Sequence, residues 1–178
     1  MTDEPATPVE EELPASVPEL PGPLAALAEA FPGAVVESSA TGQNVFRLPG
    51  EDIVEFAAAA REGGFEMFID VTAVDYRGSR PGPRFDLVIG LLSLRHNLRL
   101  RILVGLDGDP PVVPSITGVY AGANFYEREV YDLFGIEFSG HPDLTRIMLP
   151  DDWDGHPLRK DSPVGSVPIQ FRGTHKVQ

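Results

Sequence analysis

The chain has 178 residues, of which 14 are basic and 27 acidic, and it contains no cysteine. The absence of Cys excludes a disulfide framework, a thiolate nucleophile and an iron–sulfur cluster bound by the chain's own thiolates. The formal net charge of −13 argues against nucleic acid or an anionic lipid surface as a partner, because both need basic residues that neutralise phosphates. The length suits one domain.

Neither a membrane span nor a targeting segment is apparent in the sequence. The longest apolar stretch, at 87–94, is far shorter than the roughly 18–20 residues of a membrane-spanning helix. The first residues lack the basic and apolar regions of a secretory signal and the arginines of a transit peptide. We therefore expect a chain that is unprocessed and works in a cytoplasm.

Residues 1–23 differ in composition from the rest of the chain. They hold six acidic residues, six prolines and no basic residue. Such a segment buries too little apolar surface to order itself, which favours a disordered, partly polyproline-like tail. We interpret it as a solubilising arm, with a docking arm as the alternative.

Periodic apolar residues predict helices and strands between residues 24 and 104. Helical spacing predicts two helices, which end at Pro-Gly and Gly-Gly pairs. Shorter apolar runs predict five strands, of which 85–94 is expected to be buried on both faces. Met67, Ile69 and Val71 are expected to share a buried face. The predicted helices cover 24–31 and 53–60, and the predicted strands 34–37, 44–48, 65–72, 85–94 and 98–104.

The order of these elements favours an α+β fold, with helices packed on a mostly antiparallel or mixed sheet. Only residues 95–97 separate two of the strands, which is the length of a hairpin loop. Neither GxGxxG nor GxxxxGK[ST] occurs, so no nucleotide-binding fingerprint supports a doubly wound alternative.

The pattern changes after these strands. Residues 107–114 are rich in Pro and are expected to break the regular structure, and Ser115 is expected to cap a short helical piece that reaches Tyr120. Asn124 is the expected N-cap of a helix over 125–134. Gly135 is placed to end that helix in a left-handed conformation.

Beyond Ile136 both the helical and the strand periods vanish, and five prolines punctuate the chain. So long a stretch without regular structure is uncommon in a compact domain unless it has a function or lies on something else. We therefore divide the chain into an acidic tail (1–23), a globular domain (24–135) and an extended, partner-wrapping segment (136–178).

Three carboxylates, Glu127, Glu129 and Asp132, lie close together on the helix predicted over 125–134. Arg128 and Asp132 are four residues apart and can pair on its surface. We interpret the cluster as a solvated or interface-facing side of the helix. Acid–base chemistry is the alternative, because like charges in a cleft separate the pKa values of neighbouring carboxyls.

Two Gly-His-Pro sequences place His141 and His156 fifteen residues apart. Pro holds the preceding His in an extended or turn conformation, and this spacing is not typical of metal ligands. We interpret both as hydrogen-bonded loop histidines, with a metal site as the less favoured alternative. Trp153, followed by Arg159 and Lys160, is typical of a surface anchor, because Trp and Arg are enriched at interface hot spots.

The sequence from Tyr126 to Ile147, YEREVYDLFGIEFSGHPDLTRI, resembles the signature of the C-subunit family of NADH-quinone oxidoreductase, the counterpart of the complex I thirty-kilodalton subunit. The similarity continues through Trp153–Asp161, WDGHPLRKD, and upstream in 72–76 and 91–94. It implies that the matching residues form the family's subunit interface and signature: Glu127, Arg128, Glu129, Asp132, Phe134, Gly135, Phe138, His141, Pro142, Arg146, Trp153, His156, Pro157, Arg159, Lys160 and Asp161.

The resemblance implies a cofactor-free, non-catalytic subunit in the hydrophilic arm of a proton-translocating NADH:quinone oxidoreductase. The iron–sulfur clusters, the flavin and the quinone site would then belong to partner subunits, with the D and B subunits as neighbours. The chain would lie on the cytoplasmic side of a bacterial cell membrane, held there by the complex.

We expect residues 136–163 to run over neighbouring subunits rather than over the chain's own core, with apolar anchors that fill partner pockets. The expected anchors are Phe138, Leu144, Ile147, Leu149, Trp153 and Leu158. Two alternatives stay open: the equivalent subunit of a related membrane-bound hydrogenase or alternative-donor oxidoreductase, and a small hydrolase that uses Glu127, Glu129, His141 or His156.

Overall fold

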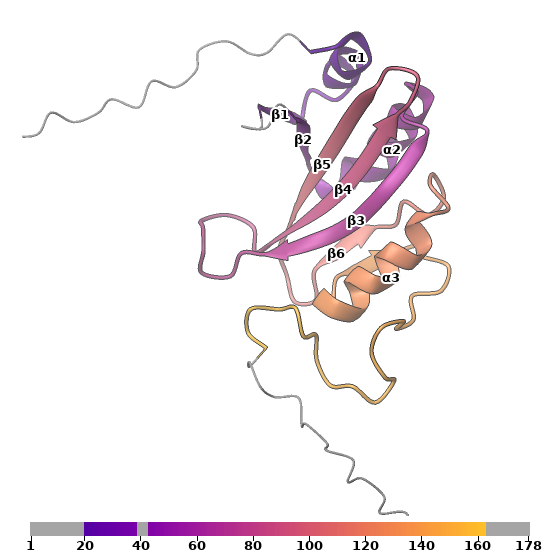
Figure 1. The fold of residues 1–178 in the computed structure, drawn as a ribbon. Coiled ribbons are helices and arrows are strands. Elements are labelled where there is room, and N and C mark those ends of the chain that lie inside the picture. The colour runs from indigo at the N-terminus through magenta and orange to yellow at the C-terminus, as the bar shows by residue number, and fades with distance from the viewer. Residues whose placement is uncertain (1–19, 39–42, 163–178) are drawn as a thin grey trace, which may run out of the picture.

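The computed structural model describes residues 20–38 and 43–162 (Figure 1). The predictions made for the acidic tail up to residue 19 and for the chain after residue 162 lie outside these ranges. Within them, no helix has the length and apolar character needed to span a bilayer.

The fold is built on a five-stranded sheet with the order β1-β2-β5-β4-β3. Three of its pairings are antiparallel, whereas β2 and β5 run parallel, so the sheet is mixed. The α+β fold with a mixed sheet is therefore confirmed. The strands are β1 (Val35–Ser38), β2 (Asn44–Leu48), β3 (Met67–Asp75), β4 (Phe85–Ser93) and β5 (Leu98–Leu106).

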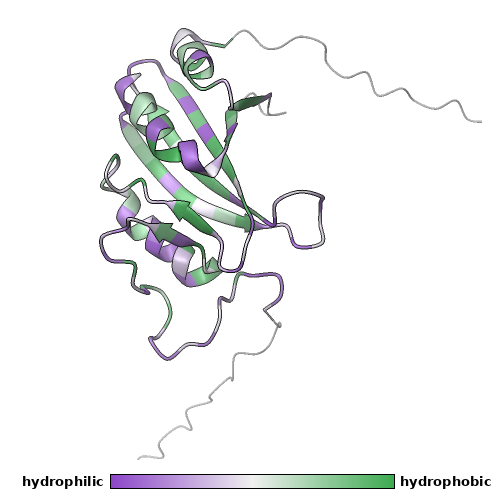
Figure 2. Cartoon of the chain, turned by 180° about the vertical axis from the view of Figure 1, so that it is seen from behind, coloured by the Kyte–Doolittle hydropathy of each residue, from purple (hydrophilic) through white to green (hydrophobic). Residues whose placement is uncertain are grey.

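Two helices accompany the sheet, α1 (Gly22–Ala30) and α2 (Ile53–Glu62), and a 3₁₀ turn (Gly50–Asp52) leads into α2. The stripe predicted on α2 is buried, because Ile53, Phe56, Ala57 and Ala60 are at most 1% exposed. Figure 2 shows α2 lying on one face of the sheet, while Figure 1 looks onto the opposite face of β3, β4 and β5, which no helix of the described residues covers.

The interior strand β4 is fully covered on one face and only partly covered on the other, which corrects the prediction. Its side chains toward α2, such as Phe85, Leu87 and Ile89, are at most 1% exposed, whereas Val88 and Gly90 on the open face are half-buried. A nearly continuous apolar run does not distinguish a covered face from one that is only partly covered.

The alternation expected in β3 is also corrected. The register shifts between Phe68 and Asp70, and beyond this bulge Val71 and Ala73 face the core. Met67 and Ile69, which were expected inside, are 39% and 36% exposed. One extra residue in a strand exchanges its two faces, and no sequence period indicates where this happens.

A second, two-stranded parallel sheet pairs β6 (Val112–Pro114) with β7 (Glu137–Ser139) around helix α3 (Ala123–Phe134). The break expected at 107–114 therefore contains a strand, and the extended segment expected from 136 onward begins with one. Ile136 and Phe138 are 0% and 3% exposed in the chain's own core, so Phe138 is not a partner anchor.

Helix α3 begins at Ala123, slightly earlier than expected. Its N-cap is Gly122, and no side chain caps it, so the capping role assigned to Asn124 is wrong. The piece at 115–120 is a single turn closed by hydrogen bonds from the Val119 and Tyr120 amides to the Ile116 carbonyl oxygen. The Tyr120 hydroxyl donates to the Phe65 carbonyl oxygen over 2.7 Å and ties this turn to the main sheet.

Candidate functional site

Residues 140–162, which we call the strap, contain neither helix nor strand. In Figure 1 the strap leaves β7 and loops below α3 and the sheet. Most of the family-signature residues lie on α3 or on the strap. The bonds between these two segments, which we call the clamp, are the candidate functional site.

Asp132 is the centre of the clamp. Its side chain is fully buried, and one carboxylate oxygen accepts from the Arg146 guanidinium at 2.7 Å. The other oxygen accepts from three consecutive backbone amides, those of Ile147 at 3.1 Å, Met148 at 2.8 Å and Leu149 at 2.9 Å. Four donors around one carboxylate hold the strap against the helix.

Burial raises the pKa of Asp132, but the backbone amides and the Arg146 guanidinium lower it more, so the pKa lies below its usual value. Asp132 is therefore ionised at neutral pH. Its charge is satisfied within the chain, which makes it a structural anchor rather than a reactive acid.

The surface pair expected between Arg128 and Asp132 does not form. Arg128 instead donates to the carbonyl and hydroxyl oxygens of Thr145, at 3.0 and 2.8 Å, and to the Arg146 carbonyl oxygen at 3.3 Å. An exposed pair four residues apart on a helix is worth only a few tenths of a kcal/mol, about 0.2–0.5. A fork of donors to several strap oxygens outweighs it.

Gly135 ends α3 in the left-handed conformation predicted for it, with φ +68°. Carbonyl oxygens at this helix end accept from Arg159: its Nε lies 2.5 Å from the Phe134 oxygen and its Nη2 lies 3.2 Å from the Gly135 oxygen. The Leu158 amide donates to the Leu133 oxygen at 3.1 Å. A cation at a helix C-terminus is also favoured by the helix dipole.

Both histidines are hydrogen-bonded loop residues, as predicted. His156 donates from Nδ1 to the Asp132 carbonyl oxygen at 2.9 Å. His141 donates from Nε2 to the Asn124 carbonyl oxygen at 3.2 Å, and its Nδ1 accepts from the Asp143 amide. Carbonyl oxygens only accept, which fixes the protonated nitrogen of each ring. In the described part of the chain, no group of three or more His, Asp or Glu residues could hold a metal.

The end of the strap is fastened to the sheet. Asp161 forms ion pairs with Arg77 and, at 2.8 Å, with Arg84, while the Lys160 amide donates to Asp75 at 2.8 Å. Arg84 also pairs with Asp75 at 2.9 Å. Burial raises the pKa of Asp75, but its bonds to the Arg84 side chain and to the Lys160 and Arg77 amides outweigh this effect and lower the pKa to about 2.

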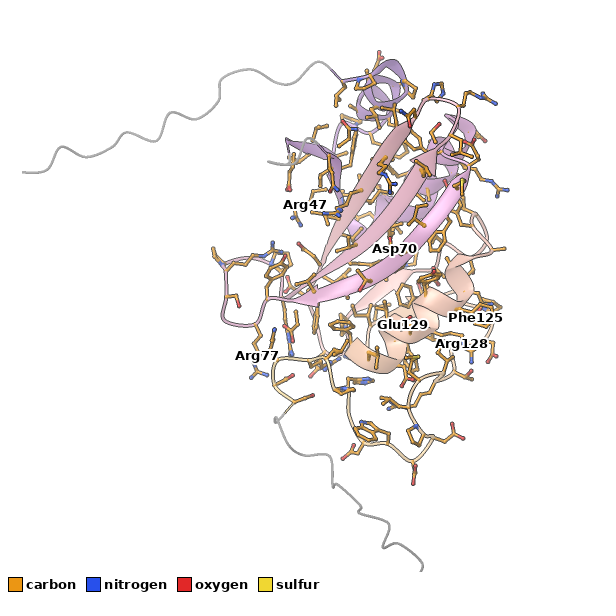
Figure 3. All side chains as sticks on the ribbon, in the orientation of Figure 1. Arg47, Asp70, Arg77, Phe125, Arg128 and Glu129 are labelled. Atoms are coloured by element: carbon orange, nitrogen blue, oxygen red, sulfur yellow. The ribbon has the colours of Figure 1, made fainter. Side chains whose placement is uncertain are left out.

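Glu127 points away from solvent and is fully buried. It accepts from the Ser115 hydroxyl at 2.6 Å and from the Ile116 amide at 2.8 Å, and so holds the 115–120 turn on α3. Burial raises its pKa more than these bonds lower it, so the net shift is upward. The prediction of a solvated or interface-facing carboxylate cluster is thus wrong for Glu127 and Asp132, which the chain itself buries. Glu129, labelled on α3 in Figure 3, is half-buried.

The clamp engages six of the polar signature residues and leaves a set of apolar side chains facing outward. The six are Arg128, Asp132, His141, Arg146, His156 and Arg159. Phe125 on α3 is 65% exposed, and Met148 and Leu158 on the strap are 61% and 49% exposed. Trp153 is half-buried, and the anchor expected at Leu144 packs partly against the chain's own core. We call Phe125, Met148 and Leu158 the outer apolar side chains.

Sequence reasoning missed Asp75, Arg77, Arg84 and Ser115 as parts of this arrangement. Arg77 and Asp161 are 84 residues apart, and Asp75 and the Lys160 amide are 85 apart. A spacing rule along the sequence cannot detect such pairs. The one available signal was that 72–76 resembles family sequence, which drew attention to the segment but assigned Asp75 no role.

The fold and the clamp define a class of small α+β domain whose last helix is fastened by polar bonds to a C-terminal strap. The model of the respiratory-chain NADH dehydrogenase 30 Kd subunit family matches residues 46–167, and the chain belongs to this family. The resemblance of the signature sequence is thereby confirmed.

Curated relatives are named as the C subunit of NADH-quinone oxidoreductase. The relative from Saccharopolyspora erythraea is 44% identical over 135 residues, which cover 74% of this chain and 54% of the relative. The relative from Roseiflexus castenholzii is 41% identical over 155 residues, 85% of this chain and 88% of the relative. The chain spans 54% and 63% of the lengths of the relatives from S. erythraea and Salinispora arenicola.

Two solved structures share the fold. A trypsin-resistant fragment of Nqo5 has a TM-score of 0.62 and 36% identity, and the match covers 68% of this chain and 99% of the fragment. A chain of an archaeal membrane-bound sulfane sulfur reductase, a respiratory membrane complex, has a TM-score of 0.69 and 26% identity. This match covers 79% of the present chain and 84% of the reductase chain.

Proposed function

We propose that this chain is a structural subunit in the peripheral arm of a respiratory NADH-quinone oxidoreductase, where it helps to hold the quinone-reducing module together. Family membership, and relatives named as the C subunit of this enzyme, support the proposal. The chain contributes geometry to electron transfer from NADH to quinone, and the redox centres lie elsewhere.

The observation that carries the proposal is that polar and apolar groups at the clamp face in different directions. Buried charges such as Asp132 bind within the chain, whereas the outer apolar side chains face away from the domain. Exposed aromatic and long apolar side chains are the kind of group that anchors a protein interface. The outer apolar side chains therefore fill pockets on partner subunits.

The state of the carboxylates and histidines supports a non-catalytic role. Glu127 is fully buried with both oxygens accepting hydrogen bonds, so a substrate has no access to it. Asp132 and His156 are likewise engaged by the strap and the helix backbone. These contacts disfavour the hydrolase alternative, which needs an accessible carboxylate or imidazole.

The partners of this chain are then the counterparts of the D and B subunits, and the iron–sulfur clusters and flavin are carried by other subunits. The lack of cysteine supports this assignment, because thiolates are the usual cluster ligands. The complex places the chain peripherally on the cytoplasmic side of a bacterial membrane.

A related complex with a different donor is the second candidate. The match to a chain of an archaeal sulfane sulfur reductase complex favours keeping it, because there the same fold belongs to a respiratory complex with another name and substrate. Identification of the donor-side subunits that co-purify with the tagged chain separates the two candidates.

The proposal is tested by substitution of the outer apolar side chains. We expect Phe125→Glu and Met148→Glu to reduce the yield of intact complex at least about tenfold, because a charge placed in an apolar pocket costs several kcal/mol, on the order of 2–5. Val112→Glu is the control, because Val112 is 52% exposed but lies on β6. Normal assembly of both variants, or stoichiometric zinc or iron in the purified chain, would contradict the proposal.

A further inference from the structure

We propose that the open face of the five-stranded sheet is a second docking surface, and that its occupant is an acidic segment of a neighbouring protein subunit. This inference depends on the proposed function in one respect, which is that the neighbouring subunit belongs to the same complex. It concerns the side of the molecule defined by β5, β4 and β3, rather than α3 and the strap.

The open face is the one that Figure 1 presents to the viewer. Thr72 and Val74 of β3, Val88 of β4 and Leu103 of β5 point to this side and are exposed or half-buried, and Val74 is 36% exposed. A sheet face left uncovered in an α+β domain usually carries polar residues. The apolar residues at the centre of this face indicate that something covers it.

A hollow of about 210 Å³ lies in this face around Gly90. Gly90 pairs with Asp70 on one side and with Arg101 on the other, and Figure 3 labels Asp70 on β3. A Cβ atom at position 90 would collide with the Asp70 carboxylate. The glycine thus lets the Asp70 carboxylate lie over position 90, and Arg99 and Arg101 also line the hollow.

The charge of the face is unusual for this chain. Most of the described basic residues bond a carboxylate or a carbonyl oxygen of the chain itself, as Arg47, Arg80 and Arg84 do. Within the described residues, no salt bridge or side-chain hydrogen bond is formed by Arg99 or Arg101, both exposed, although the chain carries a net charge of −13. The two lie on the same face of β5, about 6.8 Å apart along the strand.

Two guanidinium groups at this spacing, without a bonding partner among the described residues, match two carboxylates on a neighbouring subunit. Residues i and i+2 of an extended segment, or i and i+4 of a helix, present carboxylates at about 6–7 Å. An apolar residue of the same segment would contact Val88 and Leu103. Arg–carboxylate pairs then set the register, while the apolar contact and the hollow supply shape.

Other occupants fit these charges less well. A second copy of the chain joined by a two-fold axis would bring the same arginines face to face, which is repulsive. A nucleic acid or an anionic membrane needs more than two cations on the surface that it contacts.

The test places a photo-cross-linking amino acid at Leu103 in the full chain within the native membrane complex. We expect cross-links to another subunit, at a segment with at least two Asp or Glu residues within four positions of the cross-linked site. Cross-links to a second copy, cross-links to residues 1–19 of the same chain, or no cross-link in a fully assembled complex would each overturn the proposal.

Charge reversal supplies the second measurement. Arg99→Glu with Arg101→Glu should lower recovery of the chain in the complex about tenfold, whereas Arg95→Glu, an exposed arginine of the β4–β5 hairpin, should leave recovery unchanged. Equal recovery of both variants would contradict the proposal. The outer apolar side chains are untouched by these changes, so this test and that of the proposed function fail independently.

Discussion

At the scale of single residues, Gly135 meets two separate requirements. Its φ of +68° is a conformation that L side chains disfavour, and a Cβ there would lie 2.5 Å from the His156 ring and 2.7 Å from Arg159 Nη2. A side chain at this position would therefore strain the backbone and displace two clamp residues.

We predict that Gly135→Ala destabilises the chain by about 3 kcal/mol, of which about 1 kcal/mol comes from the backbone. Gly140→Ala is the matched control, because Gly140 also has a positive φ, +82°, but no atom lies within 4 Å of its Cβ position. Urea unfolding of both variants measures the difference. Equal losses would show that the contacts with His156 and Arg159 do not matter.

The second prediction for a single residue concerns Asp132. Asp132→Asn keeps one acceptor but loses the charge that bonds Arg146 and three amides, so we expect a loss of about 2–3 kcal/mol. The amides of 147–149 should lose hydrogen-exchange protection. Glu129→Gln, a change at a half-buried position on the same helix, should have little effect. Unchanged exchange at 147–149 in the Asp132 variant would count against the clamp.

At the scale of elements, the strap is held by carboxylates whose pKa values are lowered, namely Asp75, Asp132 and Asp161. A carboxyl whose pKa is lowered by folding stabilises the fold fully when the pH is above its pKa in the unfolded chain, about 3.9. This stabilisation is lost as the pH falls through its pKa in the folded chain. For Asp75, with a pKa of about 2, the contribution is about 2–3 kcal/mol.

Acid should therefore release the strap. We predict that the amides of 146–162 lose exchange protection once the pH is lower than about 4. The loss should reach up to about tenfold per pH unit for each carboxylate. Glu127 has a raised pKa, so its contribution persists in acid and is lost as the pH rises. The 115–120 turn should consequently outlast the strap, as amide exchange by mass spectrometry can measure. Simultaneous loss of both segments would refute this order.

Some of the helices and strands were predictable from the sequence, and others were not. The stripe on α2 and the alternation in β5 were predictable, because burial imposes their periods. The bulge at Phe68 and the strands β6 and β7, three residues each, were not, because a strand that short has no period. The clamp was missed for a related reason: Asp132 and Arg146 bond through the tertiary fold, while the local rule favoured Arg128.

At the scale of the whole molecule, the strap contacts the domain on one side and is exposed on the other. Bonds to α3 hold it, but it contributes few buried apolar side chains, so its local stability is low. In the isolated chain we predict exchange at least about tenfold faster for strap amides than for β4 amides, and slower strap exchange after assembly. Strap protection equal to that of β4 in isolation would contradict a partner-dependent strap.

If this chain supplies geometry and no chemistry, as we propose, the turnover of each assembled complex should not depend on how well the chain docks. We would measure NADH:quinone turnover per assembled complex in membranes that carry Phe125→Glu or Met148→Glu. We expect fewer complexes in these membranes, with unchanged turnover for each complex that assembles. A normal amount of complex whose turnover is lost would contradict it.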